Sequence, residues 1–276
     1  MKRYPILMVL VISVLIFSVS AFAEKAFPDI SADNSFLKNR TVKGCEHQEG
    51  YPPFIFENSV SGKLEGYSVE VLNLVFKDSG AETEYRLLPW LRCMAYMDKG
   101  EDIDIVLAAA STEERRGKYI FSDPFAEVHL AYFYDQLRYP DGLNIESPGD
   151  FESLNVCGMR GWVYENYGLS NEIIQASLTF QQVVRMVVKK RCDAFLVRYE
   201  VFKSLRAVFP GLEHYGRMKG GIIPWKKDDP IKFYFLAKRN SDYHRQLIEY
   251  INKGLKQIEK SGQLREIREK YGFASD

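Results

Sequence analysis

The sequence predicts an α/β protein built from two lobes with a cleft between them. Strand-like and helical segments alternate in the first half of the chain, and the same alternation returns after a polar connector at 147–154. Short, continuous apolar runs occur in both halves, as expected of parallel strands that are buried on both faces. Two α/β units in series therefore indicate two lobes.

The first residues predict export. Lys2 and Arg3 precede an apolar run that ends in Ala-Phe-Ala at 21–23, a small-x-small cleavage pattern. We expect a Sec-type signal peptide over residues 1–23 and a periplasmic mature chain. An uncleaved anchor is the alternative, since the run approaches the roughly 18 residues that span a bilayer. No cysteine lies near the cleavage site, so no lipid anchor is expected.

The first half of the mature chain reads as β-α-β-α-β. We expect strands at 41–48, 81–89 and 102–110 and helices at 68–80 and 90–100. In the first helix, apolar side chains recur at helical spacing, and a glycine closes each helix. This order favours a parallel sheet.

The second half repeats the alternation and then ends in helices. We expect strands at 155–161, 192–197 and 232–239, and helices at 179–190, 242–260 and 262–272. The first of these helices places four valines inward, and the second carries one apolar stripe.

Charge and cysteine usage narrow the function classes. The chain has 37 basic and 37 acidic residues, which argues against a nucleic-acid partner. The four histidines are scattered and no C-x-x-C occurs, so neither a metal site nor a cofactor is expected. If the halves are separate lobes, the natural disulfides are Cys45–Cys93 and Cys157–Cys192. Other pairings, or free buried thiols, stay open.

Six short motifs follow one another along most of the mature chain. They are YPPF (51–54), GKLEGYSVE (62–70), KGEDIDIVLAAASTEER (99–115), FSDPF (121–125), CDAFLV (192–197) and SGQLREIREKYG (261–272). Their order and separation resemble the extracytoplasmic solute-binding proteins of family 3, the polar amino-acid type that serves ABC importers. The resemblance covers the chain from Thr41 to Gly272.

This resemblance implies a type II periplasmic binding protein fold. Each lobe would be a mainly parallel sheet flanked by helices, and two crossing strands would let the lobes close like a hinge. The first lobe would be discontinuous, with residues 24–133 and 238–276, and the second lobe would hold residues 134–237. The crossings are then expected near Phe133 and Ala237.

In the first lobe the resemblance points to an arginine clamp. Thr112 and Arg115 match the T-x-x-R pattern whose arginine holds the ligand carboxylate, and Ser111 adds a hydroxyl at the strand end. A surface ion pair is the alternative for Arg115. Tyr51 and Trp90 match the family's aromatic floor, although Trp90 also suits core packing. Arg92 lies either at the cleft mouth or in solvent.

The second lobe departs from the family pattern. Its turn MRGWVYE places Gly161 and Trp162 where relatives carry a glycine and a small hydroxyl, and Arg160 and Tyr164 are further candidates. Where relatives end the D-A-x-x-x-D motif with an aspartate that pairs with the ligand ammonium, this chain has Arg198. Two cations suit a dicarboxylate, a keto acid or a phosphorylated small molecule. The alternative is that Arg198 pairs with Asp193, Glu200 or another acid and does not meet the ligand.

The function expected from these observations is binding, without catalysis, of a small polar or anionic solute. A monomer would present a carboxylate-bearing ligand to a membrane permease. Two alternatives remain: a ligand-sensing module for a membrane receptor, and a cleft enzyme of the cyclohexadienyl dehydratase type with Glu165 as its acid. No hydrolase, zinc-protease or P-loop motif supports an enzyme.

Overall fold

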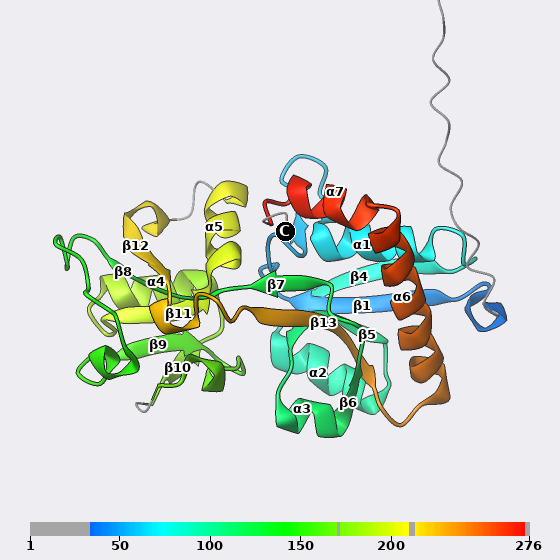
Figure 1. Cartoon of the computed structure of the whole chain (residues 1–276), viewed down its shortest axis with the longest axis horizontal. Coiled ribbons are helices and arrows are strands. Elements are labelled where there is room, and N and C mark those ends of the chain that lie inside the picture. Colours follow the sequence, from blue (N-terminus) through cyan, green and yellow to red (C-terminus); the bar gives the residue numbers. More distant parts are fainter. Residues whose placement is uncertain (1–33, 170–171, 210–212, 274–276) are drawn as a thin grey trace, which may run out of the picture.

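Two large β-sheets, each flanked by helices, lie side by side in a computed structural model of the protein (Figure 1). The structure describes residues 34–169, 172–209 and 213–273. The predicted signal peptide lies outside these residues. Within the described ranges, no helix has both the length and the apolar character needed to cross a membrane.

The first lobe is formed by two separated parts of the chain. Its strands in sheet order are β4-β1-β5-β13-β6, and β7 also pairs with β13. The elements are η1 (Ser35–Leu37), β1 (Thr41–His47), β2 (Phe56–Glu57), β3 (Leu64–Glu65), α1 (Tyr67–Phe76), β4 (Glu82–Leu88), α2 (Trp90–Lys99), β5 (Ile105–Ala110), α3 (Glu113–Lys118), β6 (Tyr119–Phe121), β7 (Ala126–Val128), β13 (Ile231–Lys238), α6 (Asp242–Lys260) and α7 (Gln263–Lys270).

The second lobe is continuous in sequence. Its sheet order is β10-β9-β11-β8-β12. The elements are β8 (Leu130–Asp135), η2 (Pro148–Phe151), β9 (Val156–Met159), η3 (Glu165–Tyr167), β10 (Ile174–Ser177), α4 (Phe180–Val188), β11 (Ala194–Arg198), α5 (Tyr199–Val208), η4 (Tyr215–Arg217), β12 (Met218–Ile222) and η5 (Pro224–Lys226).

Each sheet combines three parallel strands with antiparallel ones. In the first sheet β4, β1 and β5 run parallel, as the sequence predicts, and β13 is antiparallel to β5. In the second sheet β10, β9 and β11 run parallel, and β8 is antiparallel to β11. The antiparallel strands β8 and β13 lie next to the crossings, because each enters its sheet from the other lobe.

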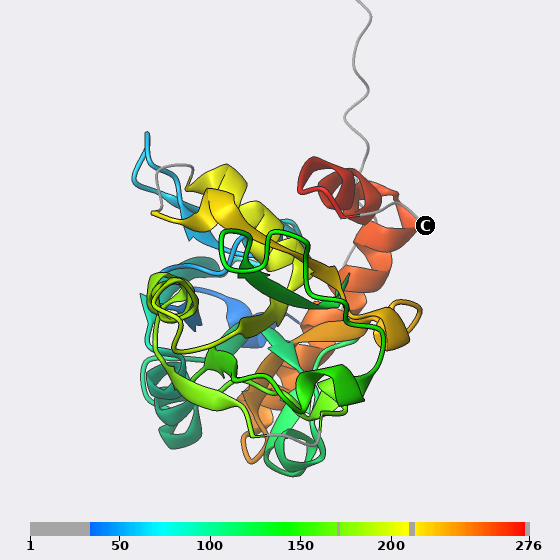
Figure 2. The ribbon, with the colours of Figure 1, turned by 90° about the vertical axis from the view of Figure 1, so that its left-hand side faces the viewer.

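The predicted core positions account for how the helices pack. All six residues of β5 are buried, as expected of a strand covered on both faces. The long helix α6 packs on the first lobe through the stripe Leu247, Ile248, Ile251, Leu255 and Ile258. Figure 2, which faces the second lobe, shows α6 and α7 in orange and red to one side of it.

The crossings between the lobes lie earlier in the chain than Phe133 and Ala237. The first is at His129, between β7 of the first sheet and β8 of the second, and the other is the segment 223–230 between β12 and β13. Phe133 pairs with Phe195 inside the second sheet, and Ala237 pairs with Ile105 inside the first. These strands are held along their length by ladder hydrogen bonds, so we expect bending between the lobes to occur in the short segments before them.

Each lobe contains one disulfide. Cys45 bonds to Cys93 in the first lobe, and Cys157 bonds to Cys192 in the second. This is the pairing expected if the two halves are separate lobes. The four cysteines are fully buried in the cores of their lobes.

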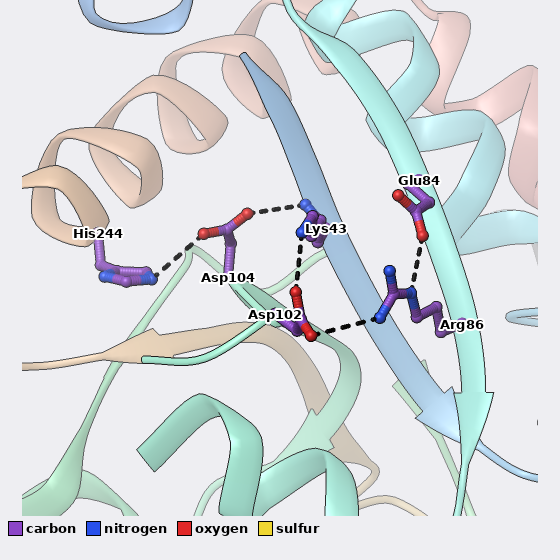
Figure 3. A network of polar contacts seen from close by, with 6 residues as sticks. All are labelled: Lys43, Glu84, Arg86, Asp102, Asp104 and His244. Atoms are coloured by element: carbon purple, nitrogen blue, oxygen red, sulfur yellow. Dashed lines mark hydrogen bonds and ion pairs between the residues drawn. The ribbon is translucent and has the colours of Figure 1, made fainter. Parts of the chain in front are cut away.

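A polar network joins the start of β1 to its neighbours (Figure 3). The main-chain N–H of Lys43 donates to Asp104 at 2.8 Å, and its ammonium lies 3.0 Å from Asp102. Arg86 then connects Asp102 to Glu84, and His244 of α6 lies 3.6 Å from Asp104. The network fastens one end of the first sheet, while the opposite end of β1 faces the second lobe.

Candidate functional site: the inter-lobe pocket

A pocket lies between the lobes at the carboxyl ends of β1, β5 and β11, where ligands bind in open α/β sheets. Its lining residues are Glu46, Tyr51, Trp90, Ala108, Ala109, Ala110, Arg115, Trp162, Val163, Arg198 and Phe233. The cavity has a volume of about 40 Å³. With the lobes in this position, the pocket suits a compact polar ligand.

Glu46 is the acidic residue of the pocket. It lies near the end of β1 and is only 2% exposed. Its carboxyl oxygens accept hydrogen bonds from the main-chain N–H groups of His47 and Ala108, both at 3.0 Å. Burial outweighs these donors and the nearby charge of Arg115, and it raises the pKa of Glu46 to about 8. Near neutral pH this carboxyl is therefore mostly protonated.

Arg115 supplies one cation. The Thr112 hydroxyl caps α3 by accepting from the Arg115 main-chain N–H at 3.1 Å, and this fixes the start of the helix. The guanidinium donates to the Ala110 carbonyl at 3.0 Å and lies over the Trp90 ring, 5.2 Å from its centroid. Burial, and then the charge of Arg198, lower the pKa of Arg115. Arg115 thus lines the pocket from α3, just after the carboxyl end of β5.

Arg198 supplies the second cation. It is the last residue of β11 and is 3% exposed. Its guanidinium donates to the Tyr167 hydroxyl and to the Val163 carbonyl, both at 3.2 Å, while its Nε has no hydrogen-bond partner. No carboxylate of the described chain forms an ion pair with it. The acids expected as alternatives are engaged elsewhere: Asp193 pairs with Arg138, and Glu200 lies 2.7 Å from His129.

Aromatic rings close the pocket around these charges. Tyr51 stacks on Phe233, with centroids 6.0 Å apart, and meets the edge of Trp162 from the second lobe at 5.3 Å. Trp162 also packs against Phe180 at 5.5 Å. Flat apolar walls exclude water and so strengthen charge contacts with a ligand.

Three consecutive residues at the carboxyl end of β1 connect the two lobes. The imidazole Nε2 of His47 lies 3.0 Å from the Leu178 carbonyl, and the amide of Gln48 donates to the same oxygen at 3.4 Å. The main-chain N–H of Phe180, at the start of α4, donates to the Glu49 carboxylate at 2.6 Å. We call these three interactions the rim contacts. They exist only when the lobes are together.

The structure brings together five of the residues predicted from sequence and leaves others outside. Tyr51, Trp90, Arg115, Trp162 and Arg198 line the pocket. The remaining candidates lie outside its lining: Ser111, Thr112, Gly161, Arg92, Arg160 and Tyr164.

Several of these outer residues have other structural roles. Thr112 caps α3, and the Tyr164 hydroxyl bonds to the main chain of Met159. Arg92 and Arg160 are exposed. Gly161 has a φ of 78°, and a Cβ there would lie 2.8 Å from Leu91 across the rim, so glycine allows the lobes to meet closely.

Sequence reasoning missed Glu46, Val163 and Phe233. For Glu46 a signal was present, because it stands near the carboxyl end of the predicted strand 41–48, where ligands bind in such sheets. Phe233 looks like any core aromatic of β13. Val163 contributes through a carbonyl, which side-chain patterns do not reveal.

Fold and pocket together define a two-lobed solute-binding protein. The chain matches bacterial extracellular solute-binding proteins, family 3, over residues 45–274, and it belongs to that family.

Known proteins similar to the chain agree with this assignment. The L-cystine-binding protein TcyA of Bacillus subtilis (strain 168) is 23% identical over 244 residues, which cover 87% of this chain and 84% of TcyA. Two solved structures share the fold. A histidine kinase sensor domain with similarity to periplasmic binding proteins has a TM-score of 0.70 at 20% identity, covering 85% of this chain and 96% of its own.

The second structure is an ancestral amino acid-binding protein, AncCDT-1, described as a precursor of cyclohexadienyl dehydratase. Its TM-score is 0.67 at 20% identity, covering 84% of this chain and 95% of its own. Other curated relatives are likewise named as binding proteins, in agreement with the family assignment.

Proposed function

We propose that the protein binds a small dicarboxylate, acidic amino acids included, in the inter-lobe pocket, and presents it to an ABC importer as a periplasmic monomer. The observation that carries this proposal is Arg198. It is a buried guanidinium with a free Nε, directed into a pocket that already holds Arg115. A buried cation without a counter-charge is costly, and a ligand carboxylate would remove that cost.

In this proposal each of the two arginines binds one carboxylate of the ligand. Each guanidinium is satisfied in part by neutral oxygens, those of Ala110 for Arg115 and of Tyr167 and Val163 for Arg198. Such partners hold the side chain without neutralising it, so the positive charge remains available to a ligand. A ligand with one carboxylate would leave one cation unpaired.

The protonation state of Glu46 determines whether the pocket can also bind a ligand ammonium group. When protonated, its carboxyl can donate a hydrogen bond to an anion. When ionised, it can pair with a ligand ammonium, and the pocket then offers two cations and one anion. An acidic amino acid has the complementary set. The names of the relatives, among them a probable amino-acid-binding protein, support including this class.

The test is a calorimetric panel built on matched pairs. L-aspartate and L-glutamate are compared with L-asparagine and L-glutamine, which keep the shape and lose one carboxylate, and succinate represents plain dicarboxylates. We expect the acidic members to bind roughly 100-fold more tightly than the amides, because an unpaired buried charge costs about 2–5 kcal/mol. Equal or tighter binding of the amides would overturn the proposal.

Delivery to an importer is tested separately. The name of one relative, a probable ABC transporter extracellular-binding protein, supports this role. In proteoliposomes that contain the cognate permease, the loaded protein should stimulate ATP hydrolysis. Binding without stimulation, together with capture of a membrane receptor, would favour a sensing role instead.

A further inference from the structure

The Arg198 guanidinium is held by two neutral oxygens of a single loop. Tyr167 offers its hydroxyl and Val163 its carbonyl, each 3.2 Å from a different terminal nitrogen. The guanidinium carbon also lies 5.6 Å from the centroid of the Tyr167 ring. Two of the five N–H groups are therefore fixed, and the Nε side of the fork stays free.

The Tyr167 hydroxyl is itself oriented by its surroundings. Tyr167 is fully buried, and its O–H can donate to the carbonyl of Val197 at 2.9 Å or of Ala131 at 3.3 Å. A hydroxyl has one hydrogen, so once that is donated only lone pairs remain for Arg198. Burial raises the pKa of Tyr167, which keeps the phenol neutral beside the cation.

A further contact fixes the main chain of Tyr167. The indole N–H of Trp225, in the segment that crosses between the lobes, donates to the Tyr167 carbonyl at 3.0 Å. Tyr167 thus contacts β8, β11 and the crossing segment at once, through Ala131, Val197 and Trp225. A residue held through both its hydroxyl and its main chain can keep a long, flexible arginine in one place.

We infer that Tyr167 is a positioning residue that directs the charge of Arg198 into the pocket and thereby sets its preference for a second ligand carboxylate. The inference rests on the proposed function. An acidic residue in the place of Tyr167 would bind Arg198 equally well but would cancel its charge. A phenol satisfies the geometry and leaves the charge for the ligand.

The chain offers a matched control in Tyr164. It lies three residues earlier, is also buried, and bonds through its hydroxyl to the main chain of Met159 and not to Arg198. Tyr167→Phe and Tyr164→Phe each remove one buried hydroxyl and keep the ring. A purely structural role would make the two variants alike.

The experiment measures affinities of both variants, and of Arg198→Gln alone and combined with Tyr167→Phe. The probes are L-glutamate and L-aspartate, with L-glutamine and L-asparagine as probes that lack the second carboxylate. We expect Tyr167→Phe to weaken binding of the acidic probes roughly tenfold and to leave the amides unchanged. Tyr164→Phe should change neither, and the double variant should bind like Arg198→Gln alone.

The outcomes separate the two ideas. Unchanged acidic-probe binding in Tyr167→Phe, or equal weakening for acids and amides, would overturn the positioning role. If Arg198→Gln itself leaves the acidic probes unaffected, the proposed function fails first. Should Tyr167→Phe not fold, Trp225→Phe removes the donor to the Tyr167 carbonyl. It should weaken the acidic probes selectively by about threefold, and a uniform or absent effect would count against the inference.

Discussion

The two lobes present one arginine each to the pocket, from comparable places in their sheets. Arg115 follows the central strand β5 by five residues and sits in the first turn of a capped helix, whereas Arg198 is itself the last residue of β11. The first lobe also contributes Glu46 and most of the aromatic wall, while the second contributes Trp162 and Val163. The first lobe follows the family pattern, and the second lobe carries the departure from it. Ligand choice should therefore depend mainly on the second lobe.

The largest effect is expected from restoring the family pattern in the second lobe. Arg198→Asp should lower affinity for acidic amino acids at least 100-fold, since the second carboxylate then meets a like charge in a buried site. It should also create binding of neutral amino acids, whose ammonium can pair with the new carboxylate. Isothermal titration calorimetry measures both changes. Arg160→Asp, the same charge change at an exposed site of the same lobe, is the control.

A variant at Glu46 tests the acid of the first lobe. With a pKa of about 8, Glu46 is mostly protonated at pH 7, so an acidic amino acid whose ammonium draws it into the ionised form should release close to one proton on binding. Glu46→Gln should abolish this release and weaken binding roughly 30-fold. Calorimetry in two buffers of different ionisation enthalpy counts the proton. Release that persists in the variant would exclude Glu46 as its source.

The same group predicts how stability depends on pH. Its pKa is raised from about 4.5 to about 8 on folding, so the folded state binds the proton more tightly. This contribution is complete below about pH 4.5 and is lost as the pH rises towards 8. The midpoint temperature of thermal unfolding should therefore fall across this pH range in the wild type, relative to Glu46→Gln. The exposed Glu57, changed to Gln, should track the wild type.

A smaller effect is expected at the rim contacts, to which both lobes contribute. Glu49→Ala removes the acceptor for the Phe180 main-chain N–H, a bond worth about 1 kcal/mol net. Because this bond exists only with the lobes together, ligand dissociation should speed up about fivefold while association stays unchanged. Stopped-flow kinetics measures both rates. Glu49→Gln keeps an oxygen acceptor, so its ligand dissociation rate should rise less than that of Glu49→Ala.

The smallest effect on binding is expected at Thr112, which lies outside the pocket lining. Thr112→Ala removes the cap of α3 and should cost about 1 kcal/mol in the free energy of unfolding. Affinity for acidic amino acids should stay within about threefold of the wild type. Chemical denaturation and calorimetry report the two quantities. Thr112→Ser keeps the hydroxyl and should behave like the wild type. A large loss of affinity in Thr112→Ala that is absent in Thr112→Ser would assign the hydroxyl a direct role.

Much of the fold was predictable because its signals are local. The apolar run of β5, the stripe of α6 and the glycine after α2 each determine an element without reference to the rest of the chain. The positions of the crossings could not be predicted in this way. The sequences of β8 and β13 have the same apolar character as interior strands, so they do not mark where the chain passes between the lobes. Only their pairing shows that His129 and the segment 223–230 connect the lobes.

The site divides in the same way. Arg115 and Arg198 were predicted from their places in the family motifs T-x-x-R and D-A-x-x-x-D, and in the structure both lie at or just after strand ends, where ligands bind. The partners of Arg198 could not be predicted from the sequence. Asp193 and Glu200 are close to it in the chain and were the natural candidates for an ion pair. Their side chains are engaged by Arg138 and His129, residues distant in sequence that only the folded chain brings to them. Tyr167 is equally invisible in the sequence, where it resembles any buried aromatic.

The disulfides have a consequence for how the protein is made. Each bond joins cysteines that are neighbours in order along the chain, the first with the second and the third with the fourth. A chain that emerges N-terminus first into an oxidising compartment exposes Cys93 before Cys157 has appeared. An oxidant that joins each cysteine to the one before it would therefore reach the native set without reshuffling. The second lobe can be cross-linked before the C-terminal helices that complete the first have been delivered.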